Sequence, residues 1–170
     1  MAKKAIRPIR IEGNIAYVPL TQGYEAVIDA ADVPLVDGVN WCAAVDNKNV
    51  YAVRSVRNQG KQRQVRMHRV ISSAPDDLDV DHRDGNGLNN RRENLRAATQ
   101  SQNAQNQRIS AANTSGVKGV YWNAVDRKWM ARVAEGKKRH FVGLFDSLED
   151  AAAAVAKKRT ELHGEFARAA

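Results

Sequence analysis

Asp81 and His82 adjoin a loop rich in Gly, Asn and Arg, and a run of Asn and Gln follows that loop. A neutral imidazole can accept a proton from water near neutral pH. A carboxylate is a hard ligand for a divalent cation, which can stabilise a leaving oxygen. Neighbouring strand residues point to opposite faces, so Asp81 and His82 can share a site only at a strand end or a bend. Together these residue types suit the hydrolysis of a phosphodiester.

A cation held by one carboxylate needs a second protein ligand from elsewhere in the chain. A helix start is suitable, because its free N–H groups and its dipole also favour a phosphate. The stretch SQNAQNQRISAA predicts such a helix, with Ser101 as the N-cap. Asn103 lies two residues later and offers a neutral amide oxygen. One carboxylate and one amide leave most coordination positions to water and phosphate oxygens, as expected for Mg²⁺, with Mn²⁺ as the alternative.

Short strands must position these residues. VDH, which ends at His82, predicts a strand end, and LRAAT, which begins at Leu95, predicts a second short strand. Residues 1–65 contain three further β-rich runs, IAYVPL, YEAVID and VYAVRSV, separated by Gly, Asn and Asp. Trp41 is expected in the core of this segment rather than stacked on a base.

In this order, the Asp–His pair, the Gly/Asn loop, ENLRAAT and SQNAQN resemble the ββα-metal motif of the HNH endonucleases. The spacing of 13 residues from Asp81 to Asn94, and of nine more to Asn103, is similar to that of the phage homing-endonuclease branch. The resemblance implies that His82 is the general base and that Asp81 and Asn103 bind one divalent metal ion. It implies that Asn94 fixes the loop and the His82 ring. The rival amides, which this spacing disfavours, are Asn89, Asn90 and Asn106.

The formal net charge is +8, and the excess lies after residue 52. A cationic surface favours an anionic partner, most often nucleic acid. Residues 54–69 hold six Arg or Lys and no acid. In and around them, the pattern Val53, Val56, then Val65, Met67 and Val70 predicts two strands joined by an Asn-Gln-Gly turn. Such a ribbon can follow a phosphate backbone, and the alternative is a solvated hairpin. The side chains expected on DNA here are Arg54, Arg57, Lys61, Arg63, Arg66, His68 and Arg69.

The MHRVI stretch around His68 also resembles the phage homing branch. His68 is expected either to contact phosphate or only to pack.

Beyond AANTSG, which we interpret as a linker, the pattern changes. VKGVYW, RKWMARVA and RHFVGLF predict three strands, and SLEDAAAAVAKKRTELHG predicts a helix that Ser147 caps and Gly164 ends. Alternation places Trp129, Ala131 and Val133 against this helix. The residues expected opposite them are Lys128, Met130 and Arg132, and in the last strand Val142 and Leu144 are expected to face the helix, opposite Arg139 and Phe141.

GVYWNAVDRKWMA, GLFDSLEDAA and the helix ending in Gly resemble the Apetala-type domain of plant ethylene-response factors. In that family the open face of a three-stranded sheet enters the DNA major groove. The resemblance implies DNA contacts from Lys118, Tyr121, Asn123, Arg132, Arg139 and Phe141. Trp122 belongs either to the core or to a sugar contact. The alternative is an ordinary α+β mini-domain with basic, solvated strands.

We therefore predict an α+β chain of three parts. These are a small N-terminal β-rich segment that holds DNA (1–65), a central ββα-metal HNH nuclease motif (66–112), and an Apetala-type three-stranded antiparallel sheet with one packed helix (116–166). The predicted function is a site-specific DNA endonuclease of homing type that nicks double-stranded DNA, one strand per monomer, as a monomer or dimer. The alternatives are a non-catalytic DNA-binding regulator and a restriction or defence nuclease.

The cellular setting follows from what the sequence lacks. Cys42 is the single cysteine, so neither a disulfide framework nor a thiolate zinc site is expected. No apolar run approaches the roughly 20 residues of a membrane helix, and the first residues lack the apolar stretch of a signal peptide. We expect no membrane partner and a cytoplasmic location in a bacterial or phage-infected cell.

Overall fold

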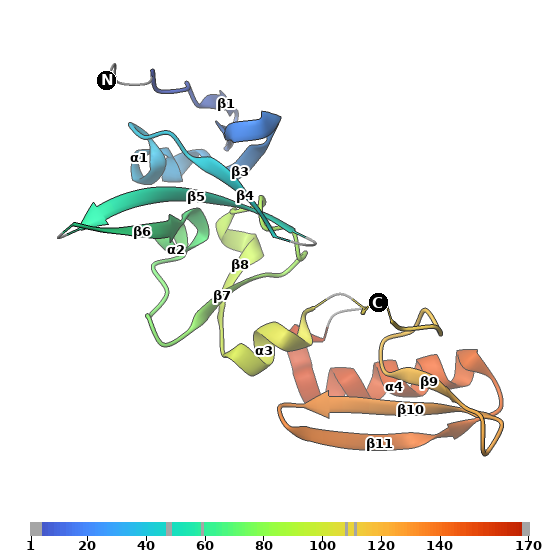
Figure 1. Ribbon diagram of the computed structural model, residues 1–170. Coiled ribbons are helices and arrows are strands. Elements are labelled where there is room, and N and C mark those ends of the chain that lie inside the picture. The colour runs from blue at the N-terminus through green and yellow to red at the C-terminus, as the bar shows by residue number, and fades with distance from the viewer. Residues whose placement is uncertain (1–4, 47–48, 59, 108, 111, 168–170) are drawn as a thin grey trace. The chain divides into compact units, whose positions relative to one another are not determined.

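The computed structural model describes residues 5–46, 49–58, 60–107, 109–110 and 112–167. The chain divides into two compact units, Met1–Ala97 and Ala98–Ala170, each with strands and helices (Figure 1). All sheets are small and antiparallel, which confirms the predicted α+β class. The finer division into three functional parts stays a prediction.

The first unit contains sheets with the strand orders β1-β2-β3, β4-β5-β6 and β7-β8. Its strands are β1 (Arg10–Glu12), β2 (Ile15–Pro19), β3 (Glu25–Asp29), β4 (Cys42–Asp46), β5 (Asn49–Asn58), β6 (Lys61–Arg66), β7 (Asp79–His82) and β8 (Leu95–Ala98). Its helical segments are the 3₁₀ turns η1 (Thr21–Gly23), η2 (Ala30–Asp32) and η3 (Arg92–Asn94), and the short helices α1 (Val33–Val36) and α2 (Met67–Ser72).

Period-two alternation builds the core of this unit. In β2 and β3 every second side chain is buried, and the register pairs Ala16 with Ile28 and Val18 with Ala26. Trp41 is fully buried, and its indole Nε1–H donates to the carbonyl of Val36 at 2.8 Å. The predicted core position of Trp41 is therefore confirmed, with its one polar atom satisfied.

The basic stretch forms the predicted hairpin, but the second strand is shorter than expected. β5 and β6 pair from Val53–Arg66 to Asn58–Lys61, and Gln59 lies outside the described residues. Met67 and Val70, which we expected in a strand, belong to α2. Met67 and Ile71, four residues apart, share one face of that helix and are fully buried, so helical periodicity prevails there.

The second unit contains the predicted three-stranded sheet, in the order β11-β10-β9, and a helix packed on it. Its elements are α3 (Gln100–Gln105), β9 (Val120–Asn123), β10 (Lys128–Glu135), β11 (Lys138–Phe145), α4 (Leu148–His163) and η4 (Gly164–Phe166). The hydroxyl of Ser147 accepts the backbone N–H of Asp150 at 3.0 Å, as a helix cap requires. Ala151 and Val155 of α4 are buried against the sheet. Ala111, the first residue of the interpreted linker, lies outside the described residues.

A β-bulge in β11 changes the predicted alternation. Ala131 pairs with Gly143, but Arg132 pairs with Phe141, so Val142 is the additional residue. Beyond the bulge the two faces exchange, and Leu144 is exposed while Phe145 packs in the core. The expectation that Leu144 faces the helix was therefore wrong, whereas Val142 does pack against the core.

Helix α3 begins earlier than predicted. Its N-cap is Thr99, whose hydroxyl accepts the N–H of Gln102, while the Gln102 side chain accepts the N–H of Thr99. This reciprocal capping box prevails over Ser101, the predicted cap. The backbone N–H of Asn103 consequently donates to the carbonyl of Thr99 at 2.9 Å, so it is part of the helix and not one of its open N-terminal groups.

Two further expectations concern the chain as a whole. Cys42 is a free, exposed thiol. Among the described residues, no helix is both long enough and apolar enough to cross a membrane.

Gly119 provides a test of packing in the second unit. It has a φ of +86°, and a Cβ there would overlap the carbonyl oxygen of Arg132. Gly116 has a similar φ of +73° but open space around it. We expect Gly116→Ala to destabilise the unit by roughly 1–2 kcal/mol through backbone strain. Gly119→Ala should cost about 1–3 kcal/mol more, because of the clash. Urea denaturation of both variants measures the difference, and equal losses would contradict the overlap.

Candidate active site

Asp81 and His82 are the last two residues of β7, and each is 5% exposed. The predicted strand end is therefore present, and β8 is the second strand that follows the loop. Gly87 in this loop lies against β5, where a Cβ would come within 2.6 Å of the Tyr51 ring and 2.5 Å of the Val50 carbonyl oxygen. The loop can approach β5 this closely only because it has a glycine there.

Asn94 ties the two ends of the loop together. Its side-chain carbonyl accepts the N–H of Asp84 at 3.0 Å, and its amide donates to the Asp84 carboxylate at 3.0 Å and to the Asn89 carbonyl at 2.8 Å. Burial alone would raise the pKa of Asp84, but hydrogen bonds from the Asn86 N–H and the Asn89 and Asn94 amides lower it below its ordinary value. Asn94 thus fastens the loop, and its catalytic role and its role at the His82 ring stay predictions.

The His82 ring is bonded to Asn90, an amide that the spacing disfavoured. Nε2 of His82 lies 3.3 Å from Oδ1 of Asn90, which is itself only 1% exposed. Burial lowers the pKa of His82, against the Asn90 hydrogen bond and the charges of Asp84 and Asp81, which raise it. Near neutral pH the imidazole is therefore uncharged, the form that accepts a proton.

His68 and Tyr51 pack around His82. The His68 and His82 ring centroids are 5.0 Å apart and nearly perpendicular, and the Tyr51 ring lies 5.9 Å from each. Burial lowers the pKa of His68 to about 3, helped by the neighbouring His82 and by Arg66 and Arg69. At 4% exposure, His68 agrees with the packing alternative, and its burial argues against a direct phosphate contact.

Asp81 forms a buried ion pair with Arg96, a residue to which the sequence analysis gave no role. Nε and Nη2 of Arg96 lie 2.8 and 2.7 Å from Oδ2 of Asp81, and both side chains are buried. Breaking such a pair typically costs about 3–5 kcal/mol. The carboxylate is therefore held in one orientation.

Of the two proposed metal ligands, Asp81 and Asn103, the structure of the first unit bears only on Asp81. A carboxylate oxygen is a hard donor, so Asp81 is the right type of ligand for a hard cation. Within the described ranges, no three His, Cys, Asp or Glu side chains gather into a metal-binding group. Asn103 lies on α3 in the second unit, and its role as a ligand stays a prediction.

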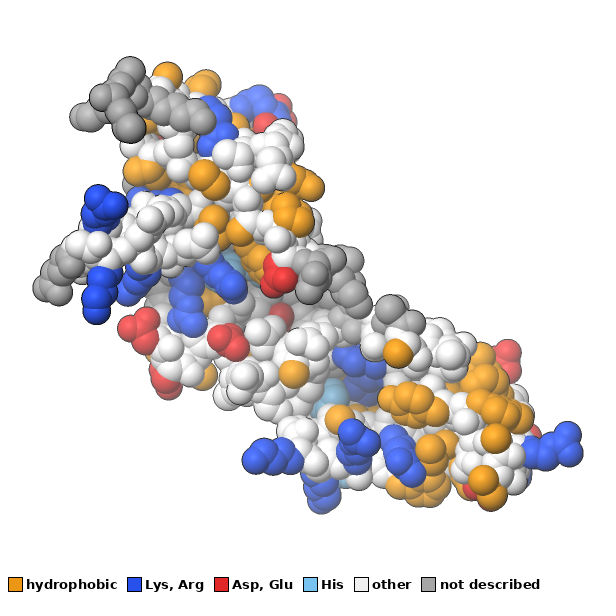
Figure 2. All heavy atoms as spheres, in the orientation of Figure 1, with side chains coloured by type: hydrophobic (Ala, Val, Ile, Leu, Met, Phe, Trp, Pro, Cys, Tyr) orange, Lys and Arg blue, Asp and Glu red, His pale blue; other side chains and the backbone are white. Residues whose placement is uncertain are grey.

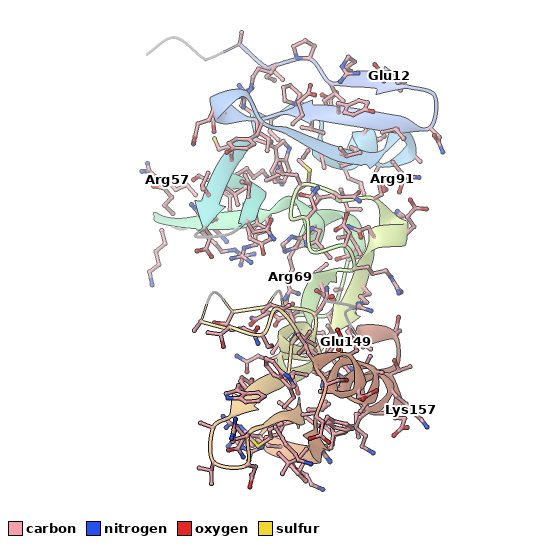
Figure 3. All side chains as sticks on the ribbon, turned by 90° about the vertical axis from the view of Figure 1, so that its right-hand side faces the viewer. Glu12, Arg57, Arg69, Arg91, Glu149 and Lys157 are labelled. Atoms are coloured by element: carbon pink, nitrogen blue, oxygen red, sulfur yellow. The ribbon has the colours of Figure 1, made fainter. Side chains whose placement is uncertain are left out.

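The residues of β5, β6 and α2 that were expected on DNA fall into two groups. Arg57, Lys61, Arg63 and Arg66 are exposed, and Lys and Arg side chains gather over β5 and β6 (Figure 2). Arg57 lies near the end of the hairpin (Figure 3). By contrast, Arg54 lies over the Trp41 ring, at 5.3 Å, and Arg69 donates to the carbonyls of Pro75 and Leu78.

The sheet of the second unit exposes cationic and apolar side chains together (Figure 2). Arg132 and Phe141 are cross-strand neighbours, and Phe141 and Tyr121 are 61% and 50% exposed. Asn123 is bonded to Asp126 in the turn, at 2.6 Å. Lys118 donates to the carbonyl of Gln105, the last residue of α3, and to that of Gln107 beyond it, so its ammonium stabilises a helix end. DNA contact by these residues stays a prediction.

The buried histidines predict an acid-sensitive first unit. The pKa of His68 is 6.5 ordinarily and about 3 when folded, so below pH 6.5 the unfolded chain binds a proton more readily. Stability should be complete above pH 6.5 and fall by up to about 1.4 kcal/mol per pH unit as pH decreases. His82, whose pKa is also lowered, acts in the same direction. Urea denaturation followed by NMR measures the free energy of unfolding of the first unit at each pH. Its pH dependence should be weaker in His68→Phe than in the wild type. In His140→Gln, a change in the second unit, it should equal that of the wild type.

Comparisons with known proteins agree with this geometry. A family model described as HNH endonuclease matches residues 66–105, which include β7, its loop and β8. Protein 3.8 of Escherichia phage T7 is 41% identical over 90 residues, 52% of this chain and 73% of that protein. "Uncharacterized HNH endonuclease L560" of Acanthamoeba polyphaga mimivirus is 35% identical over 109 residues, 61% of this chain and 56% of that protein. No solved structure matches the chain.

The family match is centred on the loop that begins at His82, and the phage relative is covered over most of its length. The chain therefore belongs to the HNH endonucleases, which are hydrolases that act on DNA.

Proposed function

We propose that this chain is a site-specific endonuclease of the homing type, which hydrolyses double-stranded DNA with one divalent metal ion and nicks one strand per monomer. The observation that carries the proposal is a buried, uncharged His82 at the end of β7, directly after a carboxylate that is held in one orientation. The phage relative supports a setting in the cytoplasm of an infected bacterial cell.

His82 is the general base of the proposed reaction. Because its pKa is lowered, the ring is neutral at physiological pH and takes a proton from the attacking water. The proton goes to the imidazole as the water oxygen attacks phosphorus, and the bond to the leaving 3′-oxygen breaks. His68, itself neutral, packs beside the ring without adding a positive charge.

HNH nucleases generally use a divalent metal ion. Asp81 would hold it through its carboxylate and, by the family resemblance, Asn103 through its amide oxygen. Mg²⁺ is the proposed ion, with Mn²⁺ as the alternative, because both ligands are hard oxygens. When bound, the ion supplies stabilisation of the charge on the leaving oxygen. Asn94 keeps the loop between the two strands closed.

Two surfaces are proposed to bind the duplex. The exposed cations of β5 and β6 contact phosphates, which carry affinity but no sequence information. The exposed sheet face of the second unit reads bases in the major groove, as its Apetala-type resemblance implies, since Arg can bond guanine in a bidentate manner. One His82 per chain accounts for one strand cut, and a double-strand break needs a dimer or two events.

The first test uses supercoiled plasmid that carries the selected target. With Mg²⁺ the wild type should produce open circles rather than linear DNA, and EDTA should stop the reaction. His82→Ala should lower the cleavage rate by at least the roughly 10²–10⁴-fold typical of a general base, while binding stays intact. Full cleavage by that variant would remove His82 from its role. Binding without Mg²⁺-dependent cleavage by the wild type would indicate a non-catalytic regulator.

Selection of cleavage sites from random DNA separates the homing type from a defence nuclease. A long, rare target supports the homing assignment, whereas short and frequent sites would overturn it.

The second test measures DNA affinity against salt. With six to ten phosphate contacts, binding should weaken ~10³–10⁵-fold between about 50 and 200 mM salt. Lys61→Gln should lower the slope of log K against log salt by about 0.9, because one contact is lost. Lys157→Gln, an exposed lysine of α4 (Figure 3), is the matched control and should leave the slope unchanged. If the DNA affinity of the wild type hardly changed with salt, the proposed phosphate contacts of β5 and β6 would be contradicted.

A further inference from the structure

We infer that Asn90 is a positioning residue for His82, and that strand β3 of the N-terminal sheet holds Asn90 in place. The N-terminal sheet is then part of the catalytic machinery, in addition to any contact it makes with DNA. This inference rests on the proposed role of His82 as the general base.

The first step concerns the orientation of the Asn90 amide. Its Nδ2 donates to the carbonyl of Leu88 at 3.1 Å, which fixes the nitrogen on that side and turns Oδ1 toward Nε2 of His82. A carbonyl oxygen can only accept, so it favours the tautomer that carries hydrogen on Nε2. In that tautomer Nδ1 has the lone pair and is the nitrogen that can take a proton. Asn90 therefore sets both the tautomer and the rotation of the ring.

The second step concerns the backbone on both sides of Asn90. The N–H of Asn90 donates to the carbonyl of Val27 at 2.7 Å, and the N–H of Val27 donates to the carbonyl of Leu88 at 2.8 Å. Val27 and Asn89 form a parallel bridge. The loop is thus paired to the edge of β3 like a short additional strand, and Leu88 receives bonds from both Val27 and Asn90.

The third step concerns the arginines that follow. Arg91 Nε lies 3.0 Å from one carboxylate oxygen of Asp29, whose other oxygen accepts the N–H of Arg92 at 2.8 Å. The Arg92 side chain bonds both oxygens of the buried Asp32, at 2.7–3.0 Å. In Figure 3, Arg91 lies between the N-terminal sheet and the loop. These charge-assisted bonds fix the exit of the loop just as Val27 fixes its middle.

A positioning role makes a specific kinetic prediction. The side chain of Asn90 is buried and touches the ring rather than the solvent, so its loss should alter the chemical step and leave DNA binding intact. Asn90→Leu keeps a similar shape and removes both polar groups. We expect its kcat to fall by roughly 10- to 100-fold, while KM and the Kd for DNA change less than about twofold. Gln107→Leu, the same kind of change at an exposed amide after α3, is the control and should retain both parameters.

The tautomer of His82 distinguishes a positioning role of Asn90 from a merely structural one, because a structural role would leave the tautomer unchanged. Nitrogen-15 NMR of His82 in the metal-free wild type should show hydrogen on Nε2, and Asn90→Leu should shift the ring toward a mixture of tautomers. A wild-type ring with hydrogen on Nδ1 overturns the inference, even if Asn90→Leu does not fold. A folded Asn90→Leu with wild-type kcat overturns it as well.

The anchor on β3 is tested separately. Asp29→Asn weakens the bonds to Arg91 and Arg92, and it should lower kcat severalfold at unchanged DNA affinity. Asp37→Asn, an exposed acid after α1, is the control and should have no effect. An unchanged kcat in Asp29→Asn would remove the anchor from the inference. Full cleavage by His82→Ala would instead remove the proposed function itself, so the two failures are distinguishable.

Discussion

A buried polar group must find a partner, and the segment between β7 and β8 is crowded with such groups. Each unsatisfied donor or acceptor would cost about 1–3 kcal/mol. The segment has no helix or full strand before η3, so its backbone is satisfied by the short bridge to Val27 and by side-chain amides. Asn49 illustrates this, because its side chain accepts the N–H of Gly87 and donates to the carbonyl of Gly85. The abundance of asparagine in this part of the sequence is therefore a consequence of folding a tight loop against a core.

Local elements could be predicted from the sequence because their causes are local. Alternation identified β2, β3 and β10, and the Ser147 cap identified the start of α4. Errors arose where a neighbouring interaction prevailed, as when the Thr99 and Gln102 pair displaced Ser101 as the N-cap.

The candidate site was predicted in part, and its long-range contacts could not be. The Asp–His pair and its strand end follow from a few adjacent residues. The partners of Arg91 and Arg92 lie about sixty residues earlier in the chain, on β3 and η2, and no spacing rule connects them. Asn90 was consequently considered only as a rival amide, although the sequence did predict strands upstream of it. The ion pair of Asp81 with Arg96 likewise required the pairing of β7 with β8.

The positive charge of the chain has two different uses. Arg96 and Arg159 are buried, and Arg159 donates to the carbonyl of Lys118. Arg91 and Arg92 are paired with acids. The formal net charge therefore overstates the cations that face an anionic partner, and exposed residues such as Lys61 and Arg63 are better indicators of such a surface.

The bond between His82 and Asn90 spans eight residues whose two ends are both fixed, one by the end of β7 and the other by the edge of β3. A residue gained or lost between them would break either the ring contact or the bridge at Val27. The number of residues between His82 and Asn90 is therefore a structural requirement of this site, in addition to the identity of the histidine.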